Sequence, residues 1–139
     1  MKRNKLIIDY EFDFELIGII STAKGYKLAW EINQLLGIHL IKQPDLTVGF
    51  KKDEEKNFSY YAHETRLNRL KLFKNKPNET ETGKYFLIPE FPHFDFIILA
   101  QMEEHPKADI ISSIKIISDV QLAAFIPLEG LKSKSNFVF

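Results

Sequence analysis

The hydrophobic period of this chain changes along its length, and that change constrains the fold more than any other feature. Residues 46–76 alternate apolar and polar positions with a period of two, which is typical of antiparallel strands. Three such strands are predicted, at residues 46–50, 58–64 and 67–74. On both sides of this stretch, a strand-like apolar run is followed by apolar residues at helical spacing. The sequence therefore predicts a β-meander between two strand–helix–strand units.

The first unit begins with residues 12–20, which alternate at first and then become apolar on both sides. This pattern predicts a strand that enters the middle of a sheet. A helix is predicted next, over residues 23–37. Ser21 or Thr22 is the expected cap of this helix, and Gly37 is its expected stop. The apolar face of the helix is predicted to contain Leu28, Ile32, Leu35 and Leu36.

The second unit begins near Pro89, which lacks a backbone N–H. Residues 84–90 are predicted to form a strand that ends at this proline, and residues 94–102 to form the next strand. A helix is expected over residues 105–118, followed by a last strand at 119–127. The apolar face of this second helix is predicted to contain Ile110, Ile111, Ile114 and Ile117.

Two helices are too few to cover both faces of a large sheet, so we expect both of them on one face. The predicted fold is a single α+β domain over residues 1–139, with a mixed, mostly antiparallel sheet. The unit at residues 94–126 resembles half of a ferredoxin-like or ACT-like domain. This resemblance implies a partly ferredoxin-like fold and, as one functional alternative, a module that binds a small ligand.

Charge and cysteine content disfavour several classes of function. The 19 basic and 19 acidic residues balance, so no global charge attracts nucleic acid or an anionic membrane. The absence of cysteine removes disulfides, thiolate metal sites and cysteine nucleophiles. The histidines are scattered and the glycines isolated, so we expect no metal and no cofactor. No apolar run is long enough for a signal peptide or a membrane helix, and we expect a cytoplasmic protein.

Three polar residues interrupt the apolar stretch at residues 85–99, namely Glu90, His93 and Asp95. Two carboxylates beside an imidazole could serve as a general acid and base in a hydrolase or lyase. The same residues are also common in turns, where they accept hydrogen bonds from backbone N–H groups. We interpret them as structural residues of the Glu90–Asp95 turn, and the sequence favours a protein that is not an enzyme.

The predicted strand at residues 67–74 and the turn before it carry four basic residues. A basic sheet face beside tyrosines is typical of RNA-binding sheets, whereas exposed lysines also protect sheet edges from aggregation. With zero net charge, the sequence favours the second interpretation. The four basic residues are Arg66, Arg69, Lys71 and Lys74.

Two groups of aromatic residues are candidates for a partner surface. Tyr26 and Trp30 are i,i+4 neighbours, and they lie roughly opposite the apolar stripe of the first helix. Such residues either lie under another segment or anchor a protein partner. Phe137 and Phe139, in the C-terminal tail, either pack on the core or bind elsewhere. Packing of the tail is favoured, because free apolar tails promote aggregation.

The segment "IPEFPHFDF" resembles the motif of the IPExxxVDY family, small bacterial proteins with no assigned biochemical function. Phe94 and Phe96 replace the valine and the tyrosine of that motif, so no role of a tyrosine hydroxyl carries over. The similarity extends over nearly the whole chain, including "YKLAWEIN" and "LKSKSNFVF". It implies a bacterial origin but no activity. The residues that match the motif directly are Ile88, Pro89, Glu90 and Asp95.

The leading hypothesis from the sequence is a domain without enzymatic activity that acts through a protein partner or through self-association. The first alternative is an ACT-like module that binds a small ligand. The second is a hydrolase or lyase that uses the Glu90–Asp95 turn. Membrane association is not expected, and nucleic-acid binding is disfavoured.

Overall fold

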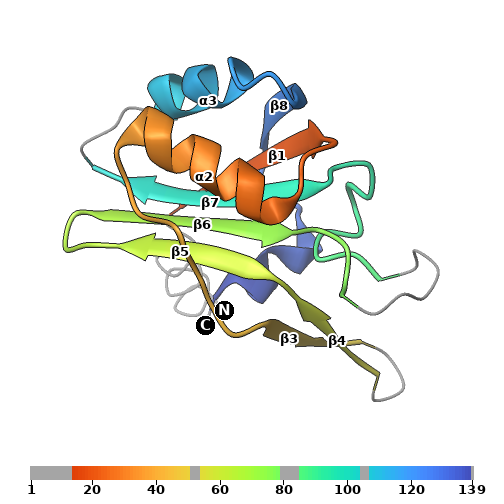
Figure 1. Cartoon of the computed structure of the whole chain (residues 1–139). Coiled ribbons are helices and arrows are strands. Elements are labelled where there is room, and N and C mark those ends of the chain that lie inside the picture. Colours follow the sequence, from red (N-terminus) through yellow and green to blue (C-terminus); the bar gives the residue numbers. More distant parts are fainter. Residues whose placement is uncertain (1–13, 51–53, 79–84, 104–106, 139) are drawn as a thin grey trace.

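The computed structural model describes residues 14–50, 54–78, 85–103 and 107–138. These residues form a six-stranded sheet, a two-stranded sheet, two α-helices and a short 3-10 helix (Figure 1). In chain order the elements are β1 (Glu15–Ser21), α2 (Gly25–Leu36), β2 (Ile41–Lys42), β3 (Leu46–Gly49), β4 (Glu55–Phe58), β5 (Tyr60–Glu64), β6 (Asn68–Lys74), β7 (Phe96–Met102), α3 (Lys107–Lys115), β8 (Val120–Ile126) and η2 (Lys132–Phe137).

The strands of the large sheet have the order β2-β5-β6-β7-β1-β8, and every neighbouring pair is antiparallel. The prediction of an α+β domain with a mostly antiparallel sheet is confirmed, and the described strands include no parallel pair. Helix α2 follows β1, and α3 connects β7 to β8. Together with β6, these elements have the βαββαβ connectivity of ferredoxin-like domains. The strands from β2 to β5 are inserted between α2 and β6.

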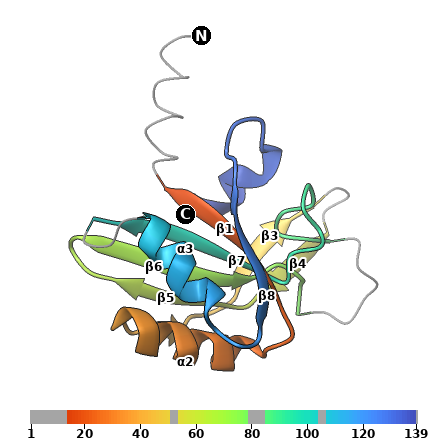
Figure 2. The same cartoon turned by 90° about the horizontal axis from the view of Figure 1, so that it is seen from above.

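Helices α2 and α3 cover one face of the large sheet, whereas β3, β4 and the C-terminal segment lie on the other face (Figure 2). The expected placement of both helices on one face is therefore confirmed. Strand β1 lies between β7 and β8, as predicted for a central strand. Ile17 and Ile19 face the helices, and Leu16 faces the other way. A central strand buries both of its faces, which explains its continuous apolar run.

The 3-10 helix η2 brings the C-terminal segment onto the face opposite the helices. The ring centroid of Phe137 lies 5.1 Å from that of Phe73 and 6.5 Å from that of Phe14. Phe137 is 2% exposed, so the predicted packing of the tail is confirmed for this residue, and it is not part of an exposed partner surface. Val138 is 40% exposed, and Phe139 lies outside the described residues.

The strand predicted at residues 84–90 is wrong, because the described residues 85–90 contain no strand, and residues 87–90 form a bend and a turn. Their backbone groups find partners on Asn75 and not on a neighbouring strand. The N–H of Leu87 donates to the backbone carbonyl of Asn75 at 2.8 Å, and the N–H of Ile88 donates to its side-chain Oδ1 at 2.8 Å. An apolar segment whose polar groups are satisfied in this way needs no sheet ladder.

The predicted meander is divided differently in the structure. Residues 58–64 belong to two strands, β4 and β5, where the sequence predicted one. β4 pairs with β3 in the separate two-stranded sheet, whereas β5 pairs with β6 and β2 in the large sheet. The period of two continues through the junction, so the alternation of apolar residues does not reveal that the strand changes its partner.

Helix α2 matches its predicted position, but its start differs from the prediction. Its N-cap is Lys24, and no side chain caps it. The hydroxyl of Ser21 donates instead to the carbonyl of Asp119 at 2.8 Å, which fastens β1 to the start of β8. Gly37 has a φ of +66° and ends the helix, as predicted. Leu35 is 41% exposed and does not belong to the buried face, which contains Leu28, Ala29 and Ile32.

Helix α3 buries its isoleucine face against the sheet. The predicted residues Ile110, Ile111, Ile114 and Ile117 are all at most 8% exposed, but the helix ends at Lys115, earlier than predicted, so Ile117 packs on the core from the segment after it. Intrinsic helix propensity is low for isoleucine, so packing of this face supplies the stability of a short helix. In the part of the chain that the structure describes, neither helix has the length and apolar character that crossing a bilayer requires.

A close contact between Gly18 and Phe94 joins the centre of β1 to the segment before β7. A Cβ atom at Gly18 would lie 2.4 Å from the Phe94 ring, closer than side chains approach one another. Phe94 is 5% exposed and belongs to the core of the second face. Gly18 is therefore required for packing, because only a residue without a side chain admits this ring.

Replacement of Gly18 by alanine is expected to destabilise the protein by about 1–3 kcal/mol, since a buried ring must move to admit the new methyl group. The matched control is Gly49→Ala, because a Cβ at Gly49 meets no atom within 4 Å. This control is expected to change the free energy of unfolding by less than about 0.5 kcal/mol. Urea unfolding followed by circular dichroism measures both variants, and equal stabilities would contradict the packing role of Gly18.

Candidate functional site

The three polar residues of the Glu90–Asp95 turn do not meet in the structure. The Glu90 carboxylate accepts hydrogen bonds from the backbone N–H of Ser133 at 3.1 Å and from its hydroxyl at 2.7 Å. The Asp95 carboxylate accepts the N–H of Ser21 at 2.9 Å. The ring of His93 lies 4.4 Å from that of Phe94. Within the described residues, no hydrogen bond or ion pair joins any two of the three polar side chains.

The environment of Glu90 favours its charged form. Partial desolvation, the largest single cause, raises the pKa of its carboxyl group, but hydrogen bonds from the Ser133 side chain and from the backbone of Glu90, Ser133 and Lys132 together outweigh it, and the pKa is lowered. A general acid at neutral pH requires the opposite shift. The Glu90 carboxylate is therefore suited to accept hydrogen bonds that attach the turn to η2, in agreement with its interpretation as a structural residue.

Asn75, which the sequence analysis did not single out, is the main polar contact of the turn. It is fully buried, and its amide donates to the carbonyls of Phe91 at 3.1 Å and Phe94 at 2.9 Å. Its Oδ1 accepts the N–H of Ile88. A buried amide is tolerated when its hydrogen bonds are made, and these bonds also satisfy the backbone of the turn. The only sequence signal was an asparagine directly after a strand.

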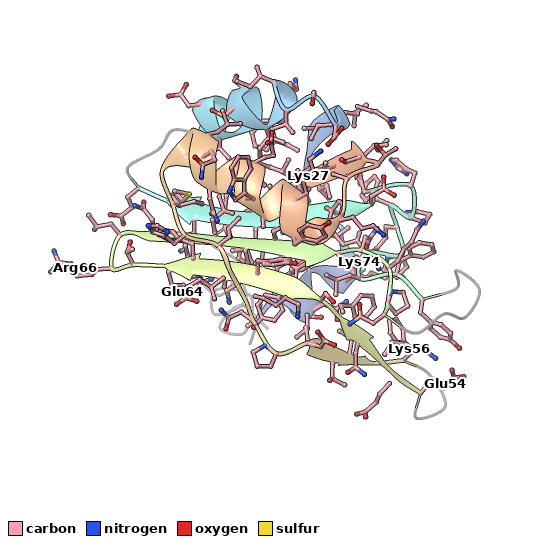
Figure 3. The ribbon with its side chains drawn as sticks, in the orientation of Figure 1. Lys27, Glu54, Lys56, Glu64, Arg66 and Lys74 are labelled. Carbon is pink, nitrogen blue, oxygen red and sulfur yellow. The ribbon has the colours of Figure 1, made fainter. Side chains whose placement is uncertain are left out.

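The four basic residues near β6 do not form one surface. Arg66 and Lys74 lie at opposite ends of β6 (Figure 3). Arg69 and Lys71 alternate with Lys74, so they point to the other face of the sheet. Lys71 is 6% exposed, and its Nζ lies 3.6 Å from the Glu64 carboxylate. Burial lowers the pKa of Lys71, although Glu64 opposes that shift.

Tyr26 and Trp30 are on the outer surface of α2, as the sequence predicted. Tyr26 is 68% exposed and Trp30 is 58% exposed, so no described segment covers either side chain. Trp30 is the single tryptophan of the chain. This surface therefore remains a candidate for binding, and Tyr26 also belongs to the cavity described next.

A cavity of about 370 Å³ lies where the start of α2 meets β5, β6 and β7. Leu72 and Phe96, which are both buried, form its apolar wall. Its polar side chains converge from four separate segments of the chain, and no described carboxylate lines it. These side chains include Lys24, Tyr26, Lys42, Ser59, Tyr61 and Lys74.

The electrostatic environment of the cavity is positive. The first turn of α2 contains no acidic residue of its own and its N-terminus has no side-chain cap, so its N–H groups and the positive end of the helix dipole favour an anion there. Lys24 and Lys74 form no ion pair with any described residue. Lys42 is partly neutralised, because its Nζ lies 3.2 Å from the Asp45 carboxylate and donates to the Gln43 carbonyl at 2.8 Å.

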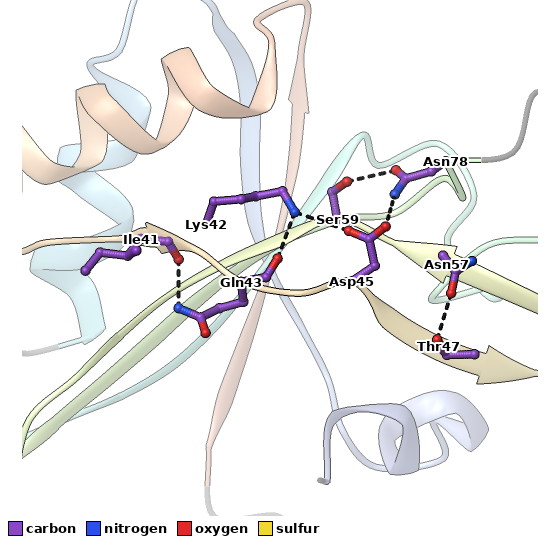
Figure 4. Close-up of polar contacts among 8 residues, drawn as sticks. All are labelled: Ile41, Lys42, Gln43, Asp45, Thr47, Asn57, Ser59 and Asn78. Atoms are coloured by element: carbon purple, nitrogen blue, oxygen red, sulfur yellow. Dashed lines mark hydrogen bonds and ion pairs between the residues drawn. The ribbon is translucent and has the colours of Figure 1, made fainter.

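A polar network holds one side of the cavity (Figure 4). The amide of Asn78 donates to the Asp45 carboxylate at 2.7 Å, and the hydroxyl of Ser59 donates to Asn78 Oδ1 at 2.9 Å. Asp45 in turn contacts Lys42. Through Asn78, the network connects Lys42 and Ser59, which come from different strands. Both cavity residues are therefore positioned before any ligand is present.

Gly25 keeps the cavity open on the helix side. A Cβ atom at this position would lie 3.4 Å from Cε1 of Tyr61 and 3.6 Å from Cε1 of Phe96. A longer side chain would therefore extend into the space between the helix and the Tyr61 ring. No described residue hydrogen-bonds the Tyr61 hydroxyl. Glycine thus allows the first turn of the helix to approach two aromatic rings, with cavity space beside them.

Sequence reasoning did not find the cavity, because its lysines belong to segments with different predicted roles. In the sequence, Lys74 belongs to the predicted basic strand, and Tyr26 to the candidate partner surface. The sequence feature that could have indicated the site is the absence of acidic residues in the first turn of α2. Among the described residues, no group of three or more histidine, aspartate or glutamate side chains could hold a metal ion.

Comparison of the chain with protein-family models, with curated proteins and with solved structures finds no match. The resemblance to the IPExxxVDY family therefore stays a prediction.

Replacement of Asn75 by alanine is expected to destabilise the protein by about 3 kcal/mol, because two buried backbone groups, at Ile88 and Phe94, and one partly buried group, at Phe91, lose their partner. The matched control is Asn78→Ala, which removes hydrogen bonds that are exposed to solvent. That control is expected to cost about 1 kcal/mol or less. Chemical denaturation measures both variants. Equal losses would show that the buried amide is not essential to the turn.

Proposed function

We propose that this protein is a binding module without catalytic activity that holds a small anionic ligand in the cavity at the start of α2. The observation that carries the proposal is the convergence of Lys24, Lys42 and Lys74 with the uncapped helix N-terminus on one cavity. A volume of about 370 Å³ is within the range of small-molecule sites. Helix N-termini beside cations favour phosphate and carboxylate groups.

The cavity also supports a narrower statement about the ligand. Leu72, Phe96 and the ring of Tyr61 provide apolar contact area, whereas the lysines and hydroxyl groups lie around them. A ligand that combines one anionic group with a flat apolar part matches both features. The volume suits a metabolite and not a folded segment of another protein. We therefore expect aromatic anions to bind more tightly than inorganic phosphate.

The position of Tyr26 connects the cavity to the exposed surface of α2. Its side chain lines the cavity, and it precedes the exposed Trp30 by one helical turn. A ligand that orders Tyr26 would change the surface beside Trp30. A partner that contacts this surface would then bind the occupied and the empty module with different affinity. Because Trp30 is the single tryptophan, its fluorescence reports on this surface without a label.

Adenosine monophosphate and phenylpyruvate are expected to raise the melting temperature, because a ligand that binds only the folded state stabilises it. Lys74→Gln is expected to weaken the affinity about tenfold, since a charge-assisted hydrogen bond contributes about 1.5 kcal/mol or more. Differential scanning fluorimetry measures the melting temperature, and titration of the Trp30 emission measures the affinity. Inorganic phosphate is the third probe and tests whether an anion without an aromatic part also binds.

The matched control is Lys76→Gln, which removes the same charge from an exposed position outside the cavity lining. This variant is expected to keep the affinity of the original protein. The proposal fails if none of the three probes raises the melting temperature. It also fails if Lys74→Gln and Lys76→Gln lose affinity equally, because the affinity would then depend on the total charge of the protein and not on the lysines that line the cavity.

A second candidate function is the binding of a protein partner through Tyr26 and Trp30. The specific observation is their exposure of 68% and 58% on one side of α2, since tyrosine and tryptophan are frequent anchors of interfaces. Phe137 no longer contributes to this hypothesis, because it is buried.

Trp30→Ala is expected to lose a protein partner that the original chain retains in affinity capture from native lysate treated with ribonuclease. The control is Ile116→Ala, which removes an exposed apolar side chain, 71% exposed, just after α3. Folding of both variants is checked by circular dichroism. Equal retention of the partner by the Trp30 variant would eliminate this surface as the interface.

A further inference from the structure

The two edges of the large sheet differ in length and chemistry. The edge strand β2 contains only two residues, one of which is Lys42, and both features protect a sheet edge against pairing. The edge strand β8 contains seven residues, "VQLAAFI", with no charge and no proline. Among the described residues, no strand pairs with its outer side. A long, uncharged edge of this kind is a template for a further strand.

The register of the sheet identifies the backbone groups that β8 presents outward. The carbonyl of Ile19 accepts the N–H of Asp95, so Ile19 directs its backbone groups toward the β7 side. Ile19 faces Ala123 across the ladder to β8. In antiparallel pairs this arrangement alternates, so Ala123 and, two residues later, Phe125 turn their N–H and carbonyl groups away from β1. These two residues form the free hydrogen-bonding edge.

The side chains of β8 are exposed on both sides of this edge. Phe125 is 43% exposed on the helix face, and Leu122 is 44% exposed on the opposite face. A shallow groove of about 400 Å³ is lined by residues 120–124 of β8 and by Lys115 of α3, and it leaves room beside the strand. Isolated apolar residues on a surface need no explanation, but here they flank unpaired backbone groups of one strand.

We propose that β8 pairs antiparallel with β8 of a second copy of this chain, about a two-fold axis at Ala124. In this register Ala123 of each copy exchanges both hydrogen bonds with Phe125 of the other. On the helix face each phenylalanine then packs beside the small Ala123 of the other copy. On the opposite face Leu122 packs beside Ile126 of the other copy. Two six-stranded sheets join into one continuous sheet.

The self-complementarity of β8 favours a second copy of this chain over another partner. A two-fold interface brings each residue of β8 against the same strand, so any charge within it would meet a like charge nearby. No such charge exists in residues 120–126. Asp119, at the start of the strand, is already paired with Lys27 at 3.0 Å. The alanines at positions 123 and 124 also keep the centre free of bulky side chains.

The first test is the mass of the full chain by light scattering at about 100 µM, where interfaces of micromolar affinity are populated. We expect the mass of two chains. Phe125→Lys and Phe125→Glu are each expected to give the mass of one chain. Each variant places the same charge on both copies near the two-fold axis, and the like charges repel. A mixture of the two variants is expected to restore the mass of two chains, since residue 125 of each copy is diagonal to that of the other.

Two further variants separate loss of pairing from loss of folding. Ala123→Pro removes an outward N–H that the chain itself does not use, and edge strands tolerate proline at such positions. It is expected to give single chains with an unchanged circular dichroism spectrum. The matched control Ile41→Lys places a charge on the opposite edge, where the side chain is 63% exposed, and is expected to keep the mass of two chains.

If the unmodified protein has the mass of one chain, the proposal is overturned, whether β8 stays unpaired or binds a different molecule. A two-chain mass that survives Phe125→Lys and Ala123→Pro also overturns it, because the interface would then be elsewhere. Failure of the mixed variants to reassociate contradicts the register at Ala124. These outcomes are independent of the anion site, which shares no residue with β8.

Discussion

The buried amide of Asn75 is the interaction on which the second half of the structure depends. An amide in an apolar core is costly unless its hydrogen bonds are made, and Asn75 makes them with the backbone of the turn that precedes β7. These bonds place Phe94 against Gly18 at the centre of β1. The conspicuous acids and prolines of the turn therefore mark a packing arrangement that one asparagine holds in place.

This arrangement also positions the cavity, although the turn itself does not line it. Asp95 accepts the N–H of Ser21, which directly precedes the loop that leads into α2. The residue after Asp95 is Phe96, which forms part of the cavity wall. One carboxylate thus fixes both the start of the helix segment and the start of β7. The turn contributes to the proposed function through position, while the lysines provide the chemistry.

The sequence predicted those helices and strands whose buried faces appear as a regular spacing of apolar residues. The isoleucines of α3 and the two-sided apolar run of β1 indicate buried faces, and the structure has both. Residues 84–90 have the composition of a strand, but the N–H groups of Leu87 and Ile88 bond to Asn75, and no periodicity encodes that contact. The cavity could not be predicted for the same reason, because Lys24, Lys42 and Lys74 meet only after the sheet has formed.

Local pairing of charges explains how a protein with equal numbers of acids and bases can place lysines without acidic partners around one cavity. Lys27 and Lys71 have acidic partners, Asp119 and Glu64, whereas Lys24 and Lys74 have none among the described residues. The positive potential is therefore local to the cavity and falls off within about 10 Å at ordinary ionic strength. The proposed anion site would therefore not attract ligands from a distance, and its selectivity would depend on contacts inside the cavity, where the aromatic rings and the helix N-terminus lie.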